Sequence, residues 1–494
     1  MQPIIKPKKL VGEQTFCFLN ESHDITAVDM WNDPNLDKLW LYNLHYFDDL
    51  NAENACQRVN EHTKIINRWI EENHPGYGNG WEPYPLSLRI VNWIKWSLSG
   101  KAMEEEWLHS LAIQIRFLSE KLEWHLLGNH LFTNAKALIF AGLYFEGEEA
   151  DTWLQKGLSI IEREIPEQVL KDGGNFELSP MYHAIFLEDL LDMVNVFHRY
   201  EHSIPSKMEA AIQSMFSWMK VMTHPDGEIS LFNDAALGVA ANFNELEQYA
   251  NRLGFNLKNE QATDLIHLKN SGYIRATNRE ALLIFDAAHI GPAYIPGHAH
   301  ADALSIEFSL FGNRVIVNSG TSCYGTGEER LRQRSTLSHS TVEINGKNSS
   351  EVWGGFRVAR RAKPIHPRAW KNAAGLHARC AHDGYKRLKG KPIHHREFVL
   401  REKTLKIIDC IDGEYKTAVG RFFLHPSTQV EIDADKQTGK LLLPDGNSVI
   451  LQVDGCEVQI VKSTYHPEFG ISIKNYCLEF TFIKPQAEIT LNWR

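Results

Sequence analysis

The spacing of apolar residues changes near residue 265, from a helical pattern to an extended one. Before that point, apolar side chains recur every three or four residues, as at Leu108, Leu111, Ala112, Ile115 and Leu122. The same spacing predicts helices at about 60–75, 85–99, 130–145, 150–163, 186–197 and 206–223. Because short polar loops separate these segments, we expect antiparallel helical hairpins stacked into a bundle or toroid over residues 1–264.

Alternation of apolar and polar residues replaces the helical spacing after residue 265. Leu304, Ile306 and Phe308 alternate with polar residues, and Gly312-Asn313 turns the chain into a partner strand that ends at Asn318. Strands are also predicted at 397–409, at 440–454 with a Pro-Asp-Gly turn, and at 478–482. Since no helices separate these strands, we expect an antiparallel β-sandwich over residues 265–494.

Length, charge and cysteine content exclude several classes of protein. A chain of 494 residues is expected to form two or three domains. Its net charge of −10 argues against a broad basic face for nucleic acid, and no apolar run approaches the roughly 20 residues that span a membrane. The seven scattered cysteines form no CxxC pair, and no apolar stretch follows the basic N-terminus. We therefore expect a cytoplasmic protein, or a periplasmic one if a leader was removed, and the sequence does not indicate an oligomeric state.

The segment Gly297-His-Ala-His-Ala-Asp302 holds the most distinctive polar residues of the second half. In an extended chain, residues two apart point to the same side, so His298 and His300 can face one site. His339 follows further along the chain, and histidines gathered on a sheet indicate metal binding or proton transfer. The alternative is that these are ordinary loop histidines in a chain that carries 23 of them.

Three polar groups stand out in the helical half. Trp81, Glu82 and Arg89 lie at the start of a helix and could line a sugar site, although helix packing explains them equally well. Asn129 precedes His130 at another helix start, where asparagine is also a common N-cap. A third group, Tyr182 with His183, begins the next long apolar helix. Together with His298 these residues form an Asn/His/Tyr/His set without a catalytic carboxylate pair.

Four motifs in this order resemble the heparinase II/III family of polysaccharide lyases, which is itself similar to certain alginate lyases. They are Gly128-Asn129-His130, Ser179-Pro-Met-Tyr182, His298-Ala-His300-Ala-Asp302 and the segment Arg334 to Val342 that contains His339. The resemblance implies an N-terminal (α/α) toroid at 1–264 joined to a C-terminal antiparallel β-sandwich at 265–494. It also implies that Asn129 and His130 bind a uronate carboxylate, that Tyr182 and His298 transfer protons, and that zinc is bound by His300, Asn318 and His339.

The chemistry of β-elimination suits these residue types. The C5 proton of a uronate is removed and the bond to O4 breaks, so Asn129 and His130 would stabilise the charge that develops on the carboxylate. Tyr182 would protonate O4 and could also act as the base, whereas His298 would be the base when the C5 hydrogen lies on the opposite face. We expect a lyase that gives C4=C5 unsaturated products from an anionic, uronate-containing oligo- or polysaccharide. The expected cytoplasmic location favours short oligosaccharides.

Two positions affect how closely the chain follows the family pattern. Asn318 stands where family members usually carry Asp, and an amide oxygen is a poorer zinc ligand because it brings no negative charge. A hydrogen-bonded His–Asn–His cluster is therefore the alternative to a metal site. Tyr324 falls close to another tyrosine of the family. We expect substrate contacts from Trp81, Glu82, Arg89, Glu177 and Tyr324.

Two other functions compete with the lyase. A glycoside hydrolase on an (α/α) barrel would need two carboxylates across a cleft, for which Glu82, Glu177 and Asp302 are the candidates. A non-catalytic protein that binds glycans or assists polysaccharide assembly could retain the same scaffold. The combination of Asn129, His130, Tyr182 and His298 argues against the second alternative.

Overall fold

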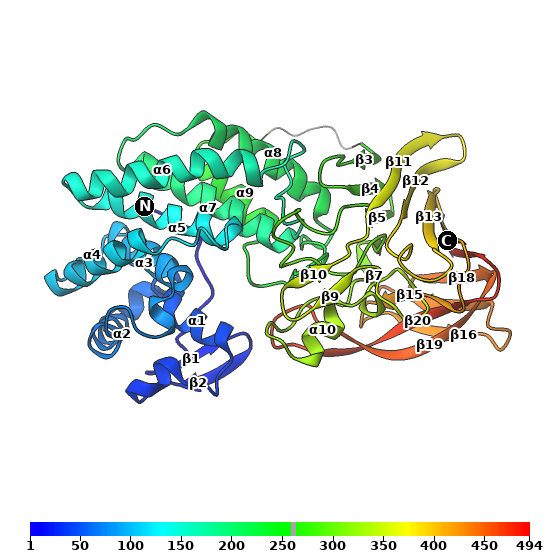
Figure 1. Cartoon of the computed structure of the whole chain (residues 1–494), viewed down its shortest axis with the longest axis horizontal. Coiled ribbons are helices and arrows are strands. Elements are labelled where there is room, and N and C mark those ends of the chain that lie inside the picture. The colour runs from blue at the N-terminus through cyan, green and yellow to red at the C-terminus, as the bar shows by residue number, and fades with distance from the viewer. Residues whose placement is uncertain (258–262) are drawn as a thin grey trace. The chain divides into compact units, whose positions relative to one another are not determined.

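The chain folds into two compact units in a computed structural model that describes residues 1–257 and 263–494 (Figure 1). The helical unit contains residues 1–168, 185–213 and 245–257, and the β-rich unit contains residues 169–184, 214–244 and the described residues from 263 onward. The β-rich unit therefore includes segments of the first half of the chain, among them the first turn of α7. The first strand of the large sheets, β3, begins at Leu265.

Helices form where the apolar spacing predicts them. The seven predicted segments, including 108–122 and 186–197, coincide with α2 to α8. The helices of the described residues are α1 (Lys38–Tyr46), α2 (Val59–Glu72), α3 (Pro83–Leu98), α4 (Glu105–Glu120), α5 (Gly128–Tyr144), α6 (Glu148–Gln168), α7 (Pro180–Arg199), α8 (Ser206–Met222), α9 (Phe243–Arg252) and α10 (Glu328–Arg334). The last of these, α10, lies within the β-rich unit and was not predicted.

Close packing of α5 against α6 positions the helix that begins with Asn129 and His130. A Cβ atom at Gly142 would lie 2.6 Å from the Leu154 nitrogen and 2.7 Å from the Ala150 oxygen, so only glycine permits this approach. Buried ion pairs connect the same helix to its other neighbours. Lys136 Nζ lies 2.6 Å from both Asp189 and Asp192 of α7, and Lys95 of α3 lies 2.5 Å from Asp192.

Two antiparallel sheets form the β-sandwich in the part of the chain that the structure describes. The first sheet has the order β11 (Pro364–Asn372), β12 (Gly375–His382), β13 (Ile393–Leu400), β14 (Thr404–Asp412), β21 (Gln486–Trp493), β18 (Ser448–Asp454), β17 (Thr438–Leu442) and β16 (Gln429–Ile432). The second has the order β19 (Cys456–Tyr465), β20 (Ile473–Phe482), β15 (Ala418–Leu424), β7 (Asn313–Val317), β6 (Ile306–Leu310), β5 (Ala281–Asp286), β4 (Tyr273–Thr277) and β3 (Leu265–His267), with β8 (Val342–Ile344) beside β15. Two small hairpins complete the strands: β1 (Thr15–Phe18) with β2 (Glu21–Asp24), and β9 (Glu351–Trp353) with β10 (Arg357–Ala359).

The apolar core lies between the inner faces of these two sheets. Phe285 of β5 meets Phe398 of β13 across it, with ring centroids 4.8 Å apart. The predicted hairpin is confirmed as β6 and β7, and the segment around the Pro-Asp-Gly turn is confirmed as β17 and β18. Residues 397–409, predicted as one strand, instead belong to β13 and β14, which are joined by a turn at 401–403. The alternation continues across this turn, so spacing alone does not reveal it.

Among the described residues, every helix is too short or too polar to cross a membrane.

Candidate active site

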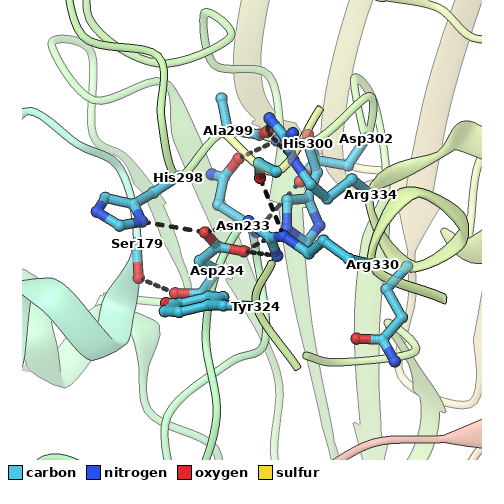
Figure 2. Close-up of polar contacts among 12 residues, drawn as sticks. Ser179, Asn233, Asp234, His298, Ala299, His300, Asp302, Tyr324, Arg330 and Arg334 are labelled. Atoms are coloured by element: carbon cyan, nitrogen blue, oxygen red, sulfur yellow. Dashed lines mark hydrogen bonds and ion pairs between the residues drawn. The ribbon is translucent and has the colours of Figure 1, made fainter. Parts of the chain in front are cut away.

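The carboxylate of Asp234 is the centre of a buried polar cluster in the β-rich unit (Figure 2). His298 donates from Nδ1 to Asp234 Oδ2 at 3.0 Å, and His300 donates from Nε2 to Asp234 Oδ1 at 2.8 Å. Arg330 of α10 binds both oxygens of the same carboxylate, with 2.7 Å between Nη2 and Oδ2. The two histidines therefore face one site, as their spacing predicts, because both bond to one side chain.

Tyr182 joins this cluster from the first turn of α7. Its ring stacks on the His298 ring with centroids 3.8 Å apart and planes inclined by 28°. Its hydroxyl lies 2.9 Å from the hydroxyl of Tyr324, and the Arg330 guanidinium lies 4.9 Å from the centre of the Tyr324 ring. The structure thus brings together Tyr182, His298 and Tyr324, three residues that the sequence placed in separate motifs.

The backbone next to these groups is held in conformations that side chains rarely adopt. Leu178, just before the first turn of α7, has φ 61°, and Asn233, beside Asp234, has φ 58°. The Asn233 amide donates to the Leu178 carbonyl at 2.9 Å, and Ser179 Oγ donates to the Asp234 carbonyl at 2.5 Å. These bonds join the two strained segments, so the loop that carries Asp234 is fixed against the start of the helix that carries Tyr182.

The segment between the two histidines is held by α10. Arg334 donates from Nη2 to the Ala299 carbonyl at 2.9 Å (Figure 2). The Ala301 nitrogen donates to the Arg334 carbonyl at 2.9 Å. The backbone nitrogen of His300 donates to Asn233 Oδ1 at 3.1 Å. An irregular segment is in this way fixed by side chains from two distant parts of the chain.

His300, Asn318 and His339 converge in the sandwich, as predicted. His300 Nδ1 lies 3.3 Å from His339 Nε2, and His339 Nδ1 lies 3.2 Å from the Asn318 side-chain amide. Because His300 uses its other nitrogen to donate to Asp234, its Nδ1 carries a lone pair that faces His339 Nε2. Two arrangements satisfy this contact: a proton on His339 Nε2, with the Asn318 amide turned to donate to His339 Nδ1, or a cation between the two rings.

The facing nitrogens fit zinc, whereas Asn318 fits it less well. Two nitrogen ligands on one tetrahedral zinc are about 3.3 Å apart, given Zn–N bonds of about 2.0–2.1 Å. Asn318, however, contacts the nitrogen of His339 that points away from His300. Within the described residues, no three His, Cys, Asp or Glu side chains are arranged to hold a metal ion.

Charge states in the cluster follow from burial and from its ion pairs. Burial by itself would raise the pKa of Asp234, but Arg330, His298 and His300 hold that pKa well below its usual range. Burial lowers the pKa of His300 to about 4, although Asp234 opposes the shift. Burial and the neighbouring His300 hold the pKa of His339 well below its usual value. Near neutral pH, Asp234 is therefore ionised, and both His300 and His339 are uncharged.

Asn129 and His130 lie in the helical unit, where they are partly exposed in the first turn of α5. His130 Nδ1 lies 2.9 Å from the Glu123 carboxylate, whose other oxygen accepts from Asn134 at 3.0 Å. The helix begins at Gly128 and its N-cap is Leu127, so N-capping, the structural alternative to a functional role, does not explain Asn129. Asn129 follows Gly128 inside the helix, where its amide accepts only a 3.4 Å contact from Thr133 among the hydrogen bonds of the described chain.

Glu82 is the one predicted substrate contact at the start of α3 that remains accessible. Its side chain is 39% exposed and lies 3.0 Å from Lys38, and its other oxygen accepts a hydrogen bond from Tyr42. Burial and this bond to Glu82 raise the pKa of Tyr42. Glu82 is thus a surface carboxylate that is already paired with two neighbours.

Three other predicted substrate contacts are corrected by the structure, because their side chains are buried. Arg89 packs 3.8 Å from the centre of the Trp69 ring and donates to Gln114 at 2.9 Å. Trp81 stacks on Trp69 and donates to the Asn73 carbonyl at 3.2 Å, so both are core residues of the helical unit. Glu177 lies buried in the loop before α7. Alternating aromatic and charged residues in a helix do not distinguish a sugar site from a core.

The sequence did not point to Asp234 or Arg330. Asp234 lies in a loop, Leu231-Phe-Asn-Asp234, without any repeat or spacing that indicates chemistry. Arg330 belongs to a short charged segment, Glu328–Arg334, which forms the helix α10 among strands. An isolated helical segment in a β-rich region was the available signal, since such an insertion is often functional.

Comparisons with known proteins agree with this architecture. The family model described as Heparinase II/III N-terminus matches residues 50–258, and the one described as Heparinase II/III-like, C-terminal, matches residues 260–491. A heparin-sulfate lyase of Bacteroides stercoris is 26% identical over 363 residues, which are 68% of this chain and 51% of that protein. A heparin-sulfate lyase of Pedobacter heparinus is 27% identical over 421 residues, which are 78% of this chain and 61% of that protein. The chain thus spans only about half to three fifths of the length of these relatives.

The solved structures confirm the fold class. The crystal structure of heparinase III aligns with a TM-score of 0.75 at 18% identity, over 91% of this chain and 76% of that one. The predicted arrangement of a helical toroid followed by an antiparallel β-sandwich is therefore correct. Since the two family matches together extend from residue 50 to residue 491, the chain belongs to the heparinase II/III family.

Proposed function

We propose that this protein is a polysaccharide lyase that cleaves a uronate-containing glycosaminoglycan by β-elimination. The observation that carries the proposal is the stacking of Tyr182 on His298, with Asp234 behind the histidine. This arrangement provides two proton-transfer groups side by side. The family membership supports the same reaction class, because curated relatives are named heparin-sulfate lyases.

The hydrogen bond to Asp234 determines which nitrogen of His298 can act as a base. His298 donates its Nδ1 proton to the ionised carboxylate, so its Nε2 carries the lone pair that can accept the C5 proton. The carboxylate also stabilises the imidazolium that forms. Tyr182, whose hydroxyl contacts that of Tyr324, is the donor for O4 of the departing sugar. Water is not consumed in such a reaction.

The negative charge that builds on the uronate carboxylate needs its own hydrogen-bond donors. We assign this role to Asn129 and His130, on the basis of the Gly128-Asn129-His130 motif and their partial exposure. His130 is oriented by Glu123, which lies 2.9 Å from its Nδ1. An amide and an imidazole supply donors without a competing negative charge, as oxyanion stabilisation requires.

The glycoside hydrolase alternative is not favoured. Glu177 and Asp302, two of its three candidate carboxylates, are buried in the β-rich unit. Burial raises the pKa of Asp302 to about 6, and the residue accepts from the Asn233 nitrogen inside the fold. A general acid or base of a hydrolase must reach the glycosidic oxygen or a water molecule, which buried carboxylates in these positions do not do.

We also propose that His300 and His339 bind zinc, with Asn318 orienting His339 through its Nδ1. When bound, the ion would link the two rings and stabilise the fold, as structural zinc does. His300 would then be held between the metal and Asp234, an arrangement common for histidine ligands. In this proposal Tyr182 and His298 still carry the proton transfers.

A product assay tests the lyase directly. The protein is incubated with heparan sulfate, heparin, chondroitin sulfate, hyaluronan and alginate, and the ultraviolet absorbance of a C4=C5 double bond is followed. We expect absorbance to rise with one of the sulfated substrates, and mass spectrometry to show fragments without added water. Fragments that contain an added water would establish a hydrolase, and binding without any cleavage would establish a non-catalytic glycan-binding protein.

A further inference from the structure

A concave site lies on the β-sandwich, lined by none of the residues of the Asp234 cluster. It is a hollow of about 640 Å³ lined by residues of β3, β11 and β12 and by Lys269. β3 and β11 are the edge strands of the two sheets and lie next to each other (Figure 1). The hollow shares no residue with the candidate active site.

Three positive charges surround this hollow. Lys269, Arg368 and Arg379 contribute to its lining, and in the described chain none of them has an acidic side chain within ion-pairing distance. The neighbouring Lys371 differs, because it pairs with Asp264 at 2.7 Å. These three cations gather without acidic partners, although the chain as a whole has a net charge of −10.

Arg368 and Arg379 are also direct partners across the β11–β12 pair. Like charges placed opposite each other destabilise a sheet, so this pairing has a cost unless an anion joins the two groups. The carboxylate nearest in register is Glu397 of β13, the partner of Arg379, and it lies 3.5 Å from His377. The two guanidinium groups therefore remain available to an external anion.

An aromatic ring forms one wall of the hollow. Trp370, two residues after Arg368, stacks on His377 with centroids 4.8 Å apart and planes inclined by 13°. The Arg379 guanidinium lies 5.6 Å from the centre of the Trp370 ring. A ring that is held in place and partly exposed suits stacking against the apolar face of a sugar, while arginine forks match planar anionic groups.

We propose that this hollow is a secondary binding site for a sulfated or carboxylated glycan segment, held by Lys269, Arg368 and Arg379 and stacked on Trp370. The choice of a glycan as the anion rests on the proposed function. Binding here would retain the substrate on the enzyme between cleavage events.

Binding to immobilised heparin and to size-defined heparan sulfate fragments tests the site. The variant Arg368→Glu with Arg379→Glu should weaken binding by about tenfold or more, because two charge-assisted contacts become repulsive. The matched control Lys436→Glu with Lys484→Glu has the same change in net charge at exposed positions of the same unit, and it should bind nearly as the wild type. Trp370→Ala should weaken binding to the glycan but not to inorganic polyphosphate.

Several outcomes would overturn the proposal. Charged residues on an edge strand also prevent strands of different molecules from pairing. Positive and negative side chains both have this effect, so glutamates would protect the edge as the arginines do. We call Arg368→Glu with Arg379→Glu the reversed variant, because both charges change sign. If it stays monomeric and binds glycan as the control does, the two arginines only protect the edge strand from pairing. If it loses binding to single-stranded DNA but not to glycan, the site serves nucleic acid.

The binding assay is independent of the product assay. If the wild type lacks lyase activity but the reversed variant loses glycan binding, the proposed function is refuted and the secondary site stands. If the protein cleaves glycan and the reversed variant binds glycan as the control does, the proposed function stands and the secondary site is refuted.

Discussion

His298 Nδ1 lies 3.0 Å from Asp234 Oδ2, and this contact decides which nitrogen of the imidazole is free. Arg330 and His300 bind the same carboxylate, so Asp234 is held in place by three partners. The dyad resembles the histidine–carboxylate pairs in which an acidic residue fixes the tautomer of a catalytic base.

Replacing Asp234 by Asn is expected to lower kcat strongly while KM changes little. The amide can donate to His298 Nδ1 and so move the ring proton to Nε2, where it blocks the base. A loss on the order of a hundred- to ten-thousand-fold in kcat is expected from comparable changes in tautomer. Nitrogen NMR shifts of His298 would show the change directly. The control Asp302→Asn alters a buried carboxylate of the same region, and an equal loss there would indicate disturbed packing instead.

Tyr182→Phe is expected to fold normally and lose most activity. The substitution removes one hydroxyl, and general acid catalysis typically contributes about a hundred- to ten-thousand-fold. Turnover is measured by the absorbance of the unsaturated product, and folding by the melting temperature. Tyr415→Phe, which removes a hydroxyl from a tyrosine elsewhere in the β-rich unit, serves as the control. Retention of most wild-type activity in Tyr182→Phe would reduce Tyr182 to a packing residue.

Asn318→Asp is expected to increase zinc binding. A carboxylate beside His339 adds negative charge near the cation, which an amide does not provide. Elemental analysis of untagged protein should show more zinc in the variant than in the wild type, and zinc should raise its melting temperature further. His339→Ala should abolish both effects. If neither the wild type nor Asn318→Asp contains or responds to zinc, the site is a hydrogen-bonded polar cluster.

Acid should weaken the β-sandwich through Asp409. Burial alone would raise the pKa of this carboxyl, but Arg396 and His394 lower it to about 2. A group with a depressed pKa stabilises the fold above its unfolded pKa, near 3.9, and this contribution is lost as the pH falls from about 4 to about 2. This difference in pKa corresponds to roughly 2.5 kcal/mol of unfolding free energy. Asp409→Asn should flatten this part of the curve of unfolding free energy against pH, whereas Asp412→Asn, at an exposed end of the same strand, should leave it unchanged.

Asp192→Ala should destabilise the helical unit. Asp192 is fully buried, contacts Lys95 and Lys136, and accepts from Tyr249 at 3.0 Å. Its removal leaves two buried ammonium groups with less compensation, which typically costs about 3–5 kcal/mol. Denaturant unfolding measures the effect. Glu149→Gln breaks the exposed pair with Arg116 and should not shift the midpoint measurably. Equal effects of the two substitutions would contradict the role assigned to the buried network.

Most helices of the first half, several strands of the second half and the order of the two halves follow from local residue spacing. Apolar spacing is a local property, so it located α2 to α8 and the β6–β7 hairpin within a few residues. The motifs containing Tyr182, His298, His300 and His339 were likewise visible, because each is a short run of chemically distinctive residues. Their convergence was a prediction that the hydrogen bonds of the structure now support.

Which polar residues contact one another became visible only in the folded chain. Trp81 and Arg89 look like site residues in the sequence but lie in the helical core, because an amphipathic pattern does not reveal which neighbours cover each side chain. Asp234 and Arg330 are 96 residues apart and have no distinctive local pattern, yet they form the ion pair behind His298. Such contacts depend on the folding of distant segments onto one another, which residue spacing does not encode.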